Sequence, residues 1–198
     1  MVYRLLDNPV VFNLAQFILA PGSRYFLNKY FGPIFKDSHG IVLDIGCGPR
    51  ALVGSSKAFL IGVDLSLDYI RQYQMAANQK GVVALSHKLC FKTHSIDECR
   101  CFGLLHHLPQ DQVTQTIRAM IDCTRPGGRI VIYDSVWPRY PLLRPFAWLS
   151  HFFDRGRWML TEERLFALTQ KAHPGPWQSH RFTYSLLGHE AVVLTLNK

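Results

Sequence analysis

The sequence predicts an α/β fold, a doubly wound and mostly parallel sheet of seven strands that closes with an antiparallel hairpin. Three observations lead to this prediction. Short apolar runs alternate with stretches that suit helices between residues 41 and 134, an order typical of parallel βαβ units. Glycines follow the first apolar run and an acid ends the second, as at the ligand-binding edge of such a sheet. Two alternating segments near the C-terminus, separated by Gly188, are typical of a hairpin.

Two helices are expected before the first strand. Asp7 can cap a helix that has Pro9 in its first turn, and Pro21-Gly22 would end this helix. A second helix is expected over Arg24–Phe35. Together these predict a helical cap over residues 1–38.

The central part, residues 39–135, is expected to bind the ligand. Apolar runs that are too short for helices mark its strands, and Ser66 can cap the helix after the second strand. The expected strands are Ile41–Ile45, Phe59–Val63, Val82–Leu85, Ile96–Phe102 and Arg129–Asp134. The expected helices lie near Ala51–Lys57, over Leu67–Asn78 and over Asp111–Cys123.

The composition changes after Asp134, where prolines, tryptophans and phenylalanines gather in Val136–Trp158. This stretch predicts a lid insertion after the fifth strand, followed by a helix that Thr161 can cap. The expected elements are helices Leu142–Phe153 and Thr161–Lys171 and strands Trp177–Leu186 and Glu190–Leu196. Residues 136–198 would complete one domain that spans the 198-residue chain.

The composition is that of a globular protein, with 48% hydrophobic and 18% charged residues. The net charge of +8 can indicate an anionic partner, or it can reflect basic residues scattered over a solvated surface. Because no run of five like charges and no separate recognition domain is present, nucleic acid is not an expected partner. Five cysteines without a metal-binding spacing predict no metal site and reduced thiols in the cytoplasm.

The stretch Ile41–Arg50 reads IVLDIGCGPR and carries the most informative pattern. Gly46 and Gly48 allow a sharp turn and the close approach of a ligand. Asp64, at the end of the next strand, can accept hydrogen bonds from ribose hydroxyls. In the dinucleotide-binding motif G-x-G-x-x-G the third glycine would fall at Ala51, and because the motif also allows alanine there, a dinucleotide site remains an alternative. However, Asp44 would repel a pyrophosphate, whereas it can hold the ammonium group of S-adenosylmethionine (SAM).

The stretch VLDIGCGP resembles motif I of the class I SAM-dependent methyltransferases. The segments Ser95–Pro109 (SIDECRCFGLLHHLP) and Thr124–Ser135 (TRPGGRIVIYDS) are similar to the fourth and fifth strands of that family with their adjoining turns. The resemblance covers roughly Ile41 to Ser135. It implies a Rossmann-like methyltransferase (EC 2.1.1 type) that uses SAM and keeps the seven-stranded sheet described above.

The resemblance also implies a set of cofactor-binding residues at the carboxyl ends of the strands. They are Asp44, Gly46, Cys47, Gly48, Asp64, Leu65, Ser86, Phe102 and Gly103. Two positions depart from the family pattern. Arg50 stands where a third glycine is common, and Ser86 follows the third strand where an adenine-binding acid is common, so cofactor affinity is expected to be modest.

His106 and Asp134 are the catalytic candidates. A histidine can act as a general base near neutral pH, but LHHL can equally be a packing segment at the junction between strand and helix. Asp134 can orient an acceptor or take a proton, or it can only cap the segment that follows.

The acceptor is expected to be a small or lipid-like molecule, because only the N-terminal cap and the insertion after Asp134 are available to select it. The aromatic insertion can wall an apolar acceptor site, rest on a membrane surface, or simply pack. Arg144, Arg155 and Arg157 can meet an anionic group or lie on the surface. Two other functions stay open: a non-catalytic SAM-fold module that stabilises a partner protein, and an NAD-type oxidoreductase.

Overall fold

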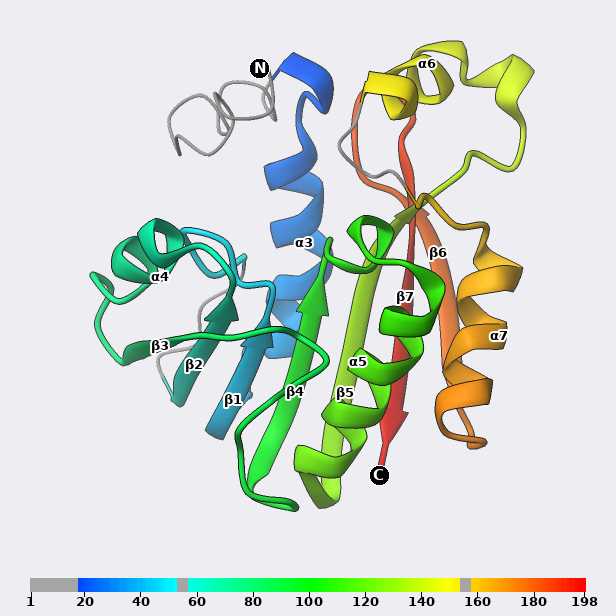
Figure 1. Cartoon of the computed structure of the whole chain (residues 1–198). Coiled ribbons are helices and arrows are strands. Elements are labelled where there is room, and N and C mark those ends of the chain that lie inside the picture. Colours follow the sequence, from blue (N-terminus) through cyan, green and yellow to red (C-terminus); the bar gives the residue numbers. More distant parts are fainter. Residues whose placement is uncertain (1–17, 53–56, 154–157) are drawn as a thin grey trace.

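A computed structural model of the chain describes residues 18–52, 57–153 and 158–198 (Figure 1). Its centre is a seven-stranded sheet with the order β3-β2-β1-β4-β5-β7-β6. Neighbouring strands from β3 to β5 are parallel, whereas β7 pairs antiparallel with both β5 and β6. The predicted fold class and the closing hairpin are thus confirmed.

The strands occur in the predicted order. They are β1 Gly40–Ile45, β2 Ala58–Asp64, β3 Gln79–Val83, β4 Ile96–Phe102, β5 Thr124–Val136, β6 Gln178–Thr183 and β7 Glu190–Asn197. The helices are α3 Ser23–Phe35, α4 Leu67–Tyr73, α5 Gln110–Cys123, α6 Pro145–Phe153 and α7 Glu162–Ala172, with short 3-10 helices η1 Leu105–His107 and η2 Pro141–Leu143. Among the described residues, no helix is long and apolar enough to cross a bilayer.

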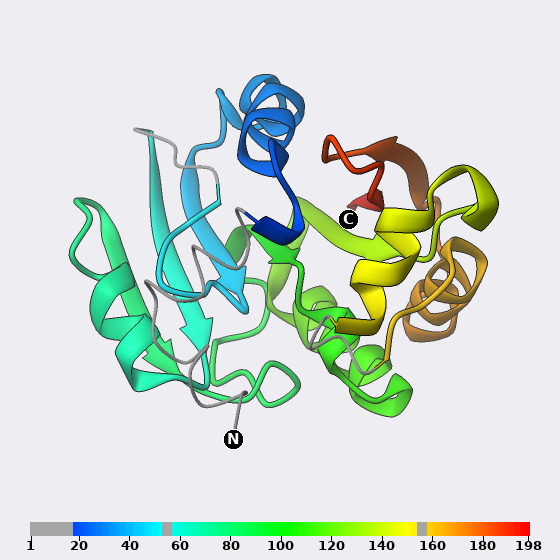
Figure 2. The ribbon, with the colours of Figure 1, turned by 90° about the horizontal axis from the view of Figure 1, so that it is seen from above.

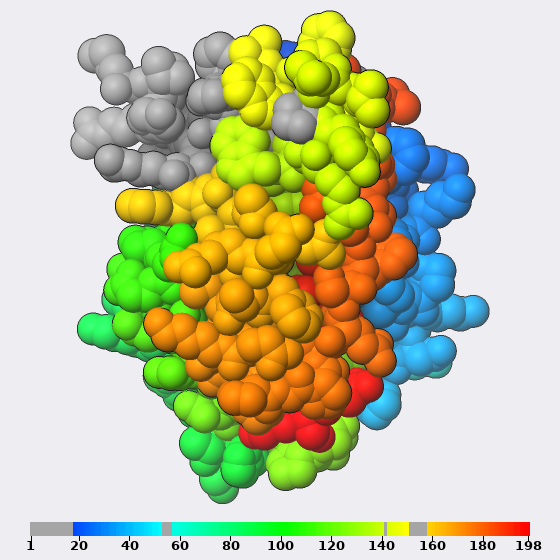
Figure 3. All heavy atoms as spheres, turned by 90° about the vertical axis from the view of Figure 1, so that its right-hand side faces the viewer, coloured from blue at the N-terminus to red at the C-terminus, as the bar shows by residue number. Residues whose placement is uncertain are grey.

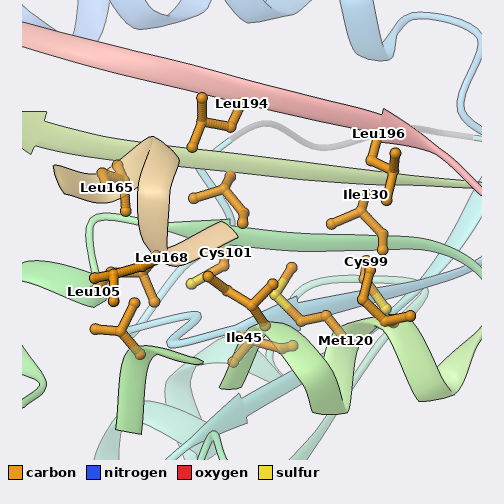
Figure 4. Packing of buried hydrophobic residues seen from close by; sticks show 14 of the residues in the cluster. Ile45, Cys99, Cys101, Leu105, Met120, Ile130, Leu165, Leu168, Leu194 and Leu196 are labelled. Atoms are coloured by element: carbon orange, nitrogen blue, oxygen red, sulfur yellow. The ribbon is translucent and has the colours of Figure 1, made fainter. Parts of the chain in front are cut away.

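Helices cover both faces of the sheet, with α3 on the side opposite to α5 and α7 (Figure 2). The α5 and α7 side holds the larger core, in which buried residues such as Ile45, Cys101 and Ile132 meet Met120 of α5 and Leu168 of α7 (Figure 4). Burying such side chains contributes roughly 1.5–3 kcal/mol each before entropy is counted. This core holds the strands of the sheet and the helices α5 and α7 in place relative to one another.

On the other face, α3 packs its phenylalanines against β4 and β5. Phe31 and Phe35 are fully buried in an aromatic cluster, in which Phe31 stacks on Phe102 and meets Tyr133 edge-on. Beneath them lies Arg100, which is 1% exposed; its guanidinium group pairs with Glu98 and lies 3.9 Å from the ring centroid of Phe35. The predicted second helix is therefore present as a layer of the fold on this face.

Several boundaries differ from the prediction for identifiable reasons. Helix α4 ends at Tyr73 rather than at Asn78; residues 74–78 form turns, and Asn78 takes a left-handed conformation (φ 58°) directly before β3. The expected turn at Pro126-Gly127-Gly128 lies inside β5, where Gly127 N donates to Lys198 O at 2.6 Å. The expected helix near Ala51–Lys57 is absent at 51–52, and residues 53–56 lie outside the described part, as does the first N-terminal helix up to residue 17.

Candidate functional site

The candidate site lies at the carboxyl edge of the sheet. Strands β1 and β4 are neighbours in the sheet although β2 and β3 come between them in the sequence, so the strand order reverses between β1 and β4. In open α/β sheets, ligands bind at such a switch point outside the carboxyl ends of the strands. The predicted residues after β1, β2, β4 and β5 therefore meet at this edge.

The glycine loop after β1 is fixed by the end of β2. Gly46 and Cys47 both donate their N–H groups to the carbonyl of Val63, at 2.8 and 3.2 Å. Gly46 has φ +70°, and a Cβ there would lie 2.9 Å from the Leu104 side chain. Gly48 has φ +60°, and its Cβ position has no described atom within 4 Å. The loop thus turns sharply at Gly46 and leaves open space at Gly48, as a ligand requires.

Asp64 connects the end of β2 to this loop. Its carboxylate accepts hydrogen bonds from the backbone N–H of Gly48 at 3.0 Å and of Ser66 at 2.9 Å. The side chain is only half-buried, so one side of the carboxylate stays accessible at the sheet edge. Asp64 therefore shapes the loop and can also meet ribose hydroxyls.

Asp44 is the unusual group of the site because it is an acid inside a buried strand, only 4% exposed. Within the described part of the chain it accepts one hydrogen bond, from Tyr73 Oη at 3.2 Å. Burial raises the pKa of Asp44 to about 6, although the nearby Arg100 and the Tyr73 hydroxyl lower it in part. A buried carboxylate of this kind is costly unless a cation meets it.

Gly62 of β2 makes room behind the loop. A Cβ at this position would stand 2.6 Å from Cys47 Sγ and 2.8 Å from the ring of Tyr73. We expect Gly62→Ala to destabilise the protein by about 1–3 kcal/mol, the usual cost of overpacking, and to weaken ligand binding because Tyr73 supports Asp44. Urea denaturation measures this change.

The matched control is Gly32→Ala in α3, where an added Cβ meets nothing within 4 Å. Alanine in a helix is favoured over glycine by about 0.5–1 kcal/mol, so this variant should be as stable as the parent or more stable. Equal stability of the two variants would contradict the packing role of Gly62.

The polar side chains after β1 and β3 are largely engaged within the protein. Burial raises the pKa of the Cys47 thiol, so it stays protonated, and Sγ lies 3.4 Å from Gly48 O. The Ser86 hydroxyl bonds to Thr116 of α5 at 3.0 Å. Nδ1 of the adjacent His87 is buried and has no hydrogen-bond partner among the described residues. His87 is thus a second candidate for adenine, which the sequence interpretation missed.

Leu65, Phe102 and Gly103 also lie at the ends of their strands. Leu65 follows β2 and is 64% exposed. Gly103 has φ +65° and donates its N–H to Tyr133 O at 2.8 Å, so β4 stays paired to β5 up to the site. These positions suit contacts with a bound ligand, and their cofactor roles remain predictions.

Asp134 and His106 form a pair between the end of β5 and η1. Oδ2 of Asp134 accepts hydrogen bonds from the backbone N–H groups of Leu105 at 2.6 Å and of His106 at 3.3 Å. Its Oδ1 bonds to Nδ1 of His106, and Asp134 is 2% exposed. A Cβ on Gly103 would lie 4.0 Å from Cε1 of His106, so the imidazole edge is next to the end of β4. Asp134 therefore holds the imidazole in place.

The segment after β5 is tied to the closing hairpin by polar contacts. Arg144 bonds to Thr183 Oγ1 at 2.8 Å and to Gly188 O at 2.7 Å, and Ser150 bonds to His189. Arg144 is thus engaged in holding η2 and α6, rather than left for an anionic substrate group. Arg155, Arg157 and the side chains of Phe152 and Phe153 lie outside the part for which side chains are described.

Two groups in the site had no signal in the sequence. Tyr73 lies 29 residues from Asp44 along the chain and reaches it only because α4 packs on β2 and β3, where the Tyr73 ring lies over Gly62. Arg100 is paired with Asp44 in the β1–β4 register. Neither residue type nor spacing predicts these contacts, which depend on tertiary packing.

Comparisons with known proteins indicate which proteins share this sequence pattern and fold. Residues 43–132 match the family model described as a methyltransferase domain, a range that begins beside Asp44 and ends in β5. A search of curated protein sequences found no significant match.

Solved structures share the fold at low sequence identity. A SAM-dependent methyltransferase from Archaeoglobus fulgidus superposes with a TM-score of 0.72 and 15% identity, over 94% of this chain and 99% of that one. A phosphoethanolamine N-methyltransferase from Haemonchus contortus, in complex with S-adenosylhomocysteine, has a TM-score of 0.64 and 16% identity, over 88% of this chain and 52% of that one. Geranyl diphosphate C-methyltransferase from Streptomyces coelicolor, also with S-adenosylhomocysteine, has a TM-score of 0.62 and 11% identity, over 85% and 74%. The chain thus matches a methyltransferase-domain family model over residues 43–132 and shares the fold of solved SAM-dependent methyltransferases.

Proposed function

We propose that the protein is a SAM-dependent methyltransferase that acts on a small or lipid-like acceptor. The observation that carries the proposal is Asp44, a buried acid whose pKa is raised by burial and whose only described hydrogen bond comes from Tyr73. An ammonium group placed beside it would offset the cost of the buried charge. SAM carries such a group and no phosphate, whereas the pyrophosphate of NAD would be repelled.

The rest of the site fits the same cofactor. Asp64 can meet the two ribose hydroxyls, and the open position at Gly48 lets the backbone approach the nucleoside. His87 lies four residues after β3, and a rotation that exposed its buried Nδ1 would let this atom accept a hydrogen bond from the adenine amino group. When bound, SAM supplies an activated methyl group, and the protein contributes orientation and the exclusion of water.

The two solved structures with bound S-adenosylhomocysteine act on small molecules, phosphoethanolamine derivatives and geranyl diphosphate. Among the residues that the structure describes, the segments above the site that could select an acceptor are short. We therefore infer a small or lipid-like acceptor rather than DNA or a large protein.

His106 is proposed as the proton acceptor of the reaction. Asp134 holds Nδ1 of His106, which directs the opposite nitrogen, Nε2, to receive a proton. An acceptor hydroxyl or amine would lose its proton to His106 as the methyl group is transferred. Asp134 is then a positioning residue, since its carboxylate is committed to His106 and to two backbone N–H groups.

The second candidate function is a non-catalytic SAM-fold module that steadies a partner protein. Arg50 in the glycine loop and the engaged Ser86 hydroxyl favour it, because both weaken the usual cofactor contacts. Single-turnover reactions with methyl-labelled SAM and cell extract separate the two. Transfer of label to a small, extractable product supports the enzyme, whereas measured SAM binding without any transfer supports the module.

Asp64→Ala tests the cofactor contacts directly. We expect it to weaken binding of S-adenosylhomocysteine by about 1–3 kcal/mol, the scale for hydrogen bonds to a charged group. Calorimetry measures the affinity, and thermal unfolding of the ligand-free variant measures its stability. A variant that is strongly destabilised but binds normally when folded would show that Asp64 serves only the loop.

A further inference from the structure

Exposed apolar side chains gather near the carboxyl edge of the sheet, and we call this group the apolar rim. Its members come from three segments, and each is at least half exposed, from 50% for Leu149 to 96% for Leu142. The rim consists of Ile18, Leu142, Leu143, Phe146, Leu149 and Leu186. Soluble surfaces rarely expose so many large apolar side chains together without a partner.

Hydrogen bonds join the three segments into one surface. Leu186 N donates to Pro21 O at 3.0 Å, which ties the β6–β7 turn to the start of α3. Arg144 bonds to Gly188 O at 2.7 Å, which ties η2 and α6 to the same turn. Figure 3 shows η2 and α6 together at the top of the face that carries α7. The rim therefore lies on the same edge as the candidate site.

The charges on these segments have one sign. Residues 18–24, 137–153 and 183–189 contain three arginines and no aspartate or glutamate, in a chain of net charge +8. Arg24 is exposed, whereas Arg139 pairs with Glu162 and Arg144 pairs with Glu190. Helix α6 adds Trp148, which is 40% exposed, to the phenylalanine and leucines of the rim. Exposed aromatic and aliphatic side chains on a short helix, in a chain of net positive charge, are typical of segments that lie in the interface of an anionic bilayer.

We propose that the rim docks onto the surface of a membrane that contains anionic lipid, with its side chains in the headgroup region. This orientation would place the opening of the site against the lipid. The proposal does not depend on methyl transfer, because docking requires only the exposed side chains and their charge.

Vesicle flotation with the full chain tests the proposal. We expect binding to vesicles of phosphatidylcholine mixed with phosphatidylglycerol, weaker binding to phosphatidylcholine alone, and partial release by salt. Replacing Leu142, Leu143 and Phe146 together by serine should lower the partition coefficient at least about tenfold. Phe146→Ser alone should also lower the partition coefficient.

The matched control is Met75→Ser. Met75 is 84% exposed and lines a hollow with Phe59 and residues 76–80, among the amino-terminal ends of β2 and β3. This variant should bind vesicles as the parent does. Equal binding by the rim and control variants, or no vesicle binding at all, would overturn the proposal. A dimer in light scattering that the rim variant abolishes, without vesicle binding, would assign the rim to a second copy of the chain instead.

Discussion

Asp44→Asn is expected to stabilise the ligand-free protein and, at the same time, to weaken SAM binding strongly. Burial raises the pKa of Asp44 to about 6, from an ordinary value of 3.8. At neutral pH the buried charge therefore costs on the order of 3 kcal/mol of stability, which the neutral amide avoids. The amide still accepts the Tyr73 hydrogen bond but cannot offset an ammonium group, so binding should fall by about 2–5 kcal/mol.

The pH dependence has a defined sign. Because the pKa of Asp44 is higher in the folded than in the unfolded state, its folded form holds a proton that the unfolded chain releases first. The stability of the ligand-free parent relative to Asp44→Asn should therefore decrease as the pH rises from about 4 to 6 and be constant above that. SAM affinity of the parent should decrease as the pH falls through about 6. Denaturant unfolding and calorimetry across this range measure both, and parallel pH profiles for parent and variant would contradict the account.

His106→Asn is expected to slow methyl transfer by about 10²–10⁴-fold, the usual contribution of a general base. The asparagine amide can keep the hydrogen bond to Asp134, but it removes the basic nitrogen. Affinity for S-adenosylhomocysteine should stay close to that of the parent, because His106 serves the acceptor. Single-turnover label transfer, at several pH values, measures the rate.

His107→Asn is the control, because His107 is exposed and its ring lies tilted beside that of His106, with the ring centroids 4.0 Å apart. It should leave the rate nearly unchanged. An unchanged rate in His106→Asn would show that the acceptor needs no base and that the pair is a packing element. Loss of S-adenosylhomocysteine binding in His106→Asn would show instead that η1 belongs to the cofactor site.

Strand β1 was predictable because buried parallel strands leave continuous apolar runs. Strand β4 carries Asp97, Glu98 and Arg100 and was predicted from its resemblance to the fourth strand of the methyltransferase family. Strand β4 has the predicted limits, Ile96–Phe102, and the Thr161 cap of α7 is confirmed by its hydrogen bond from Arg164 N. The ends of α4 and β5 were not predictable, because they depend on a left-handed Asn78 and on pairing with Lys198 at the far end of the chain.

The candidate cofactor residues were predicted from the glycines and acids at strand ends and from the resemblance to methyltransferase motif I. Their partners were not. The Tyr73 hydroxyl beside Asp44 and the commitment of Asp134 to His106 come from elements that meet only in the folded chain. The engaged Ser86 hydroxyl has the same origin, because Thr116 belongs to a later helix. Long-range packing thus decides which of the polar candidates stay available to a ligand.

The central claim is that the carboxyl edge of the sheet, with Asp44 and Asp64, binds SAM. Titration calorimetry with S-adenosylhomocysteine, set beside NAD at the same concentrations, tests it most directly. We expect S-adenosylhomocysteine to bind at a single site with an affinity that falls in Asp44→Asn and Asp64→Ala, and we expect no heat of binding for NAD. Saturable binding of NAD without any response to S-adenosylhomocysteine would contradict it.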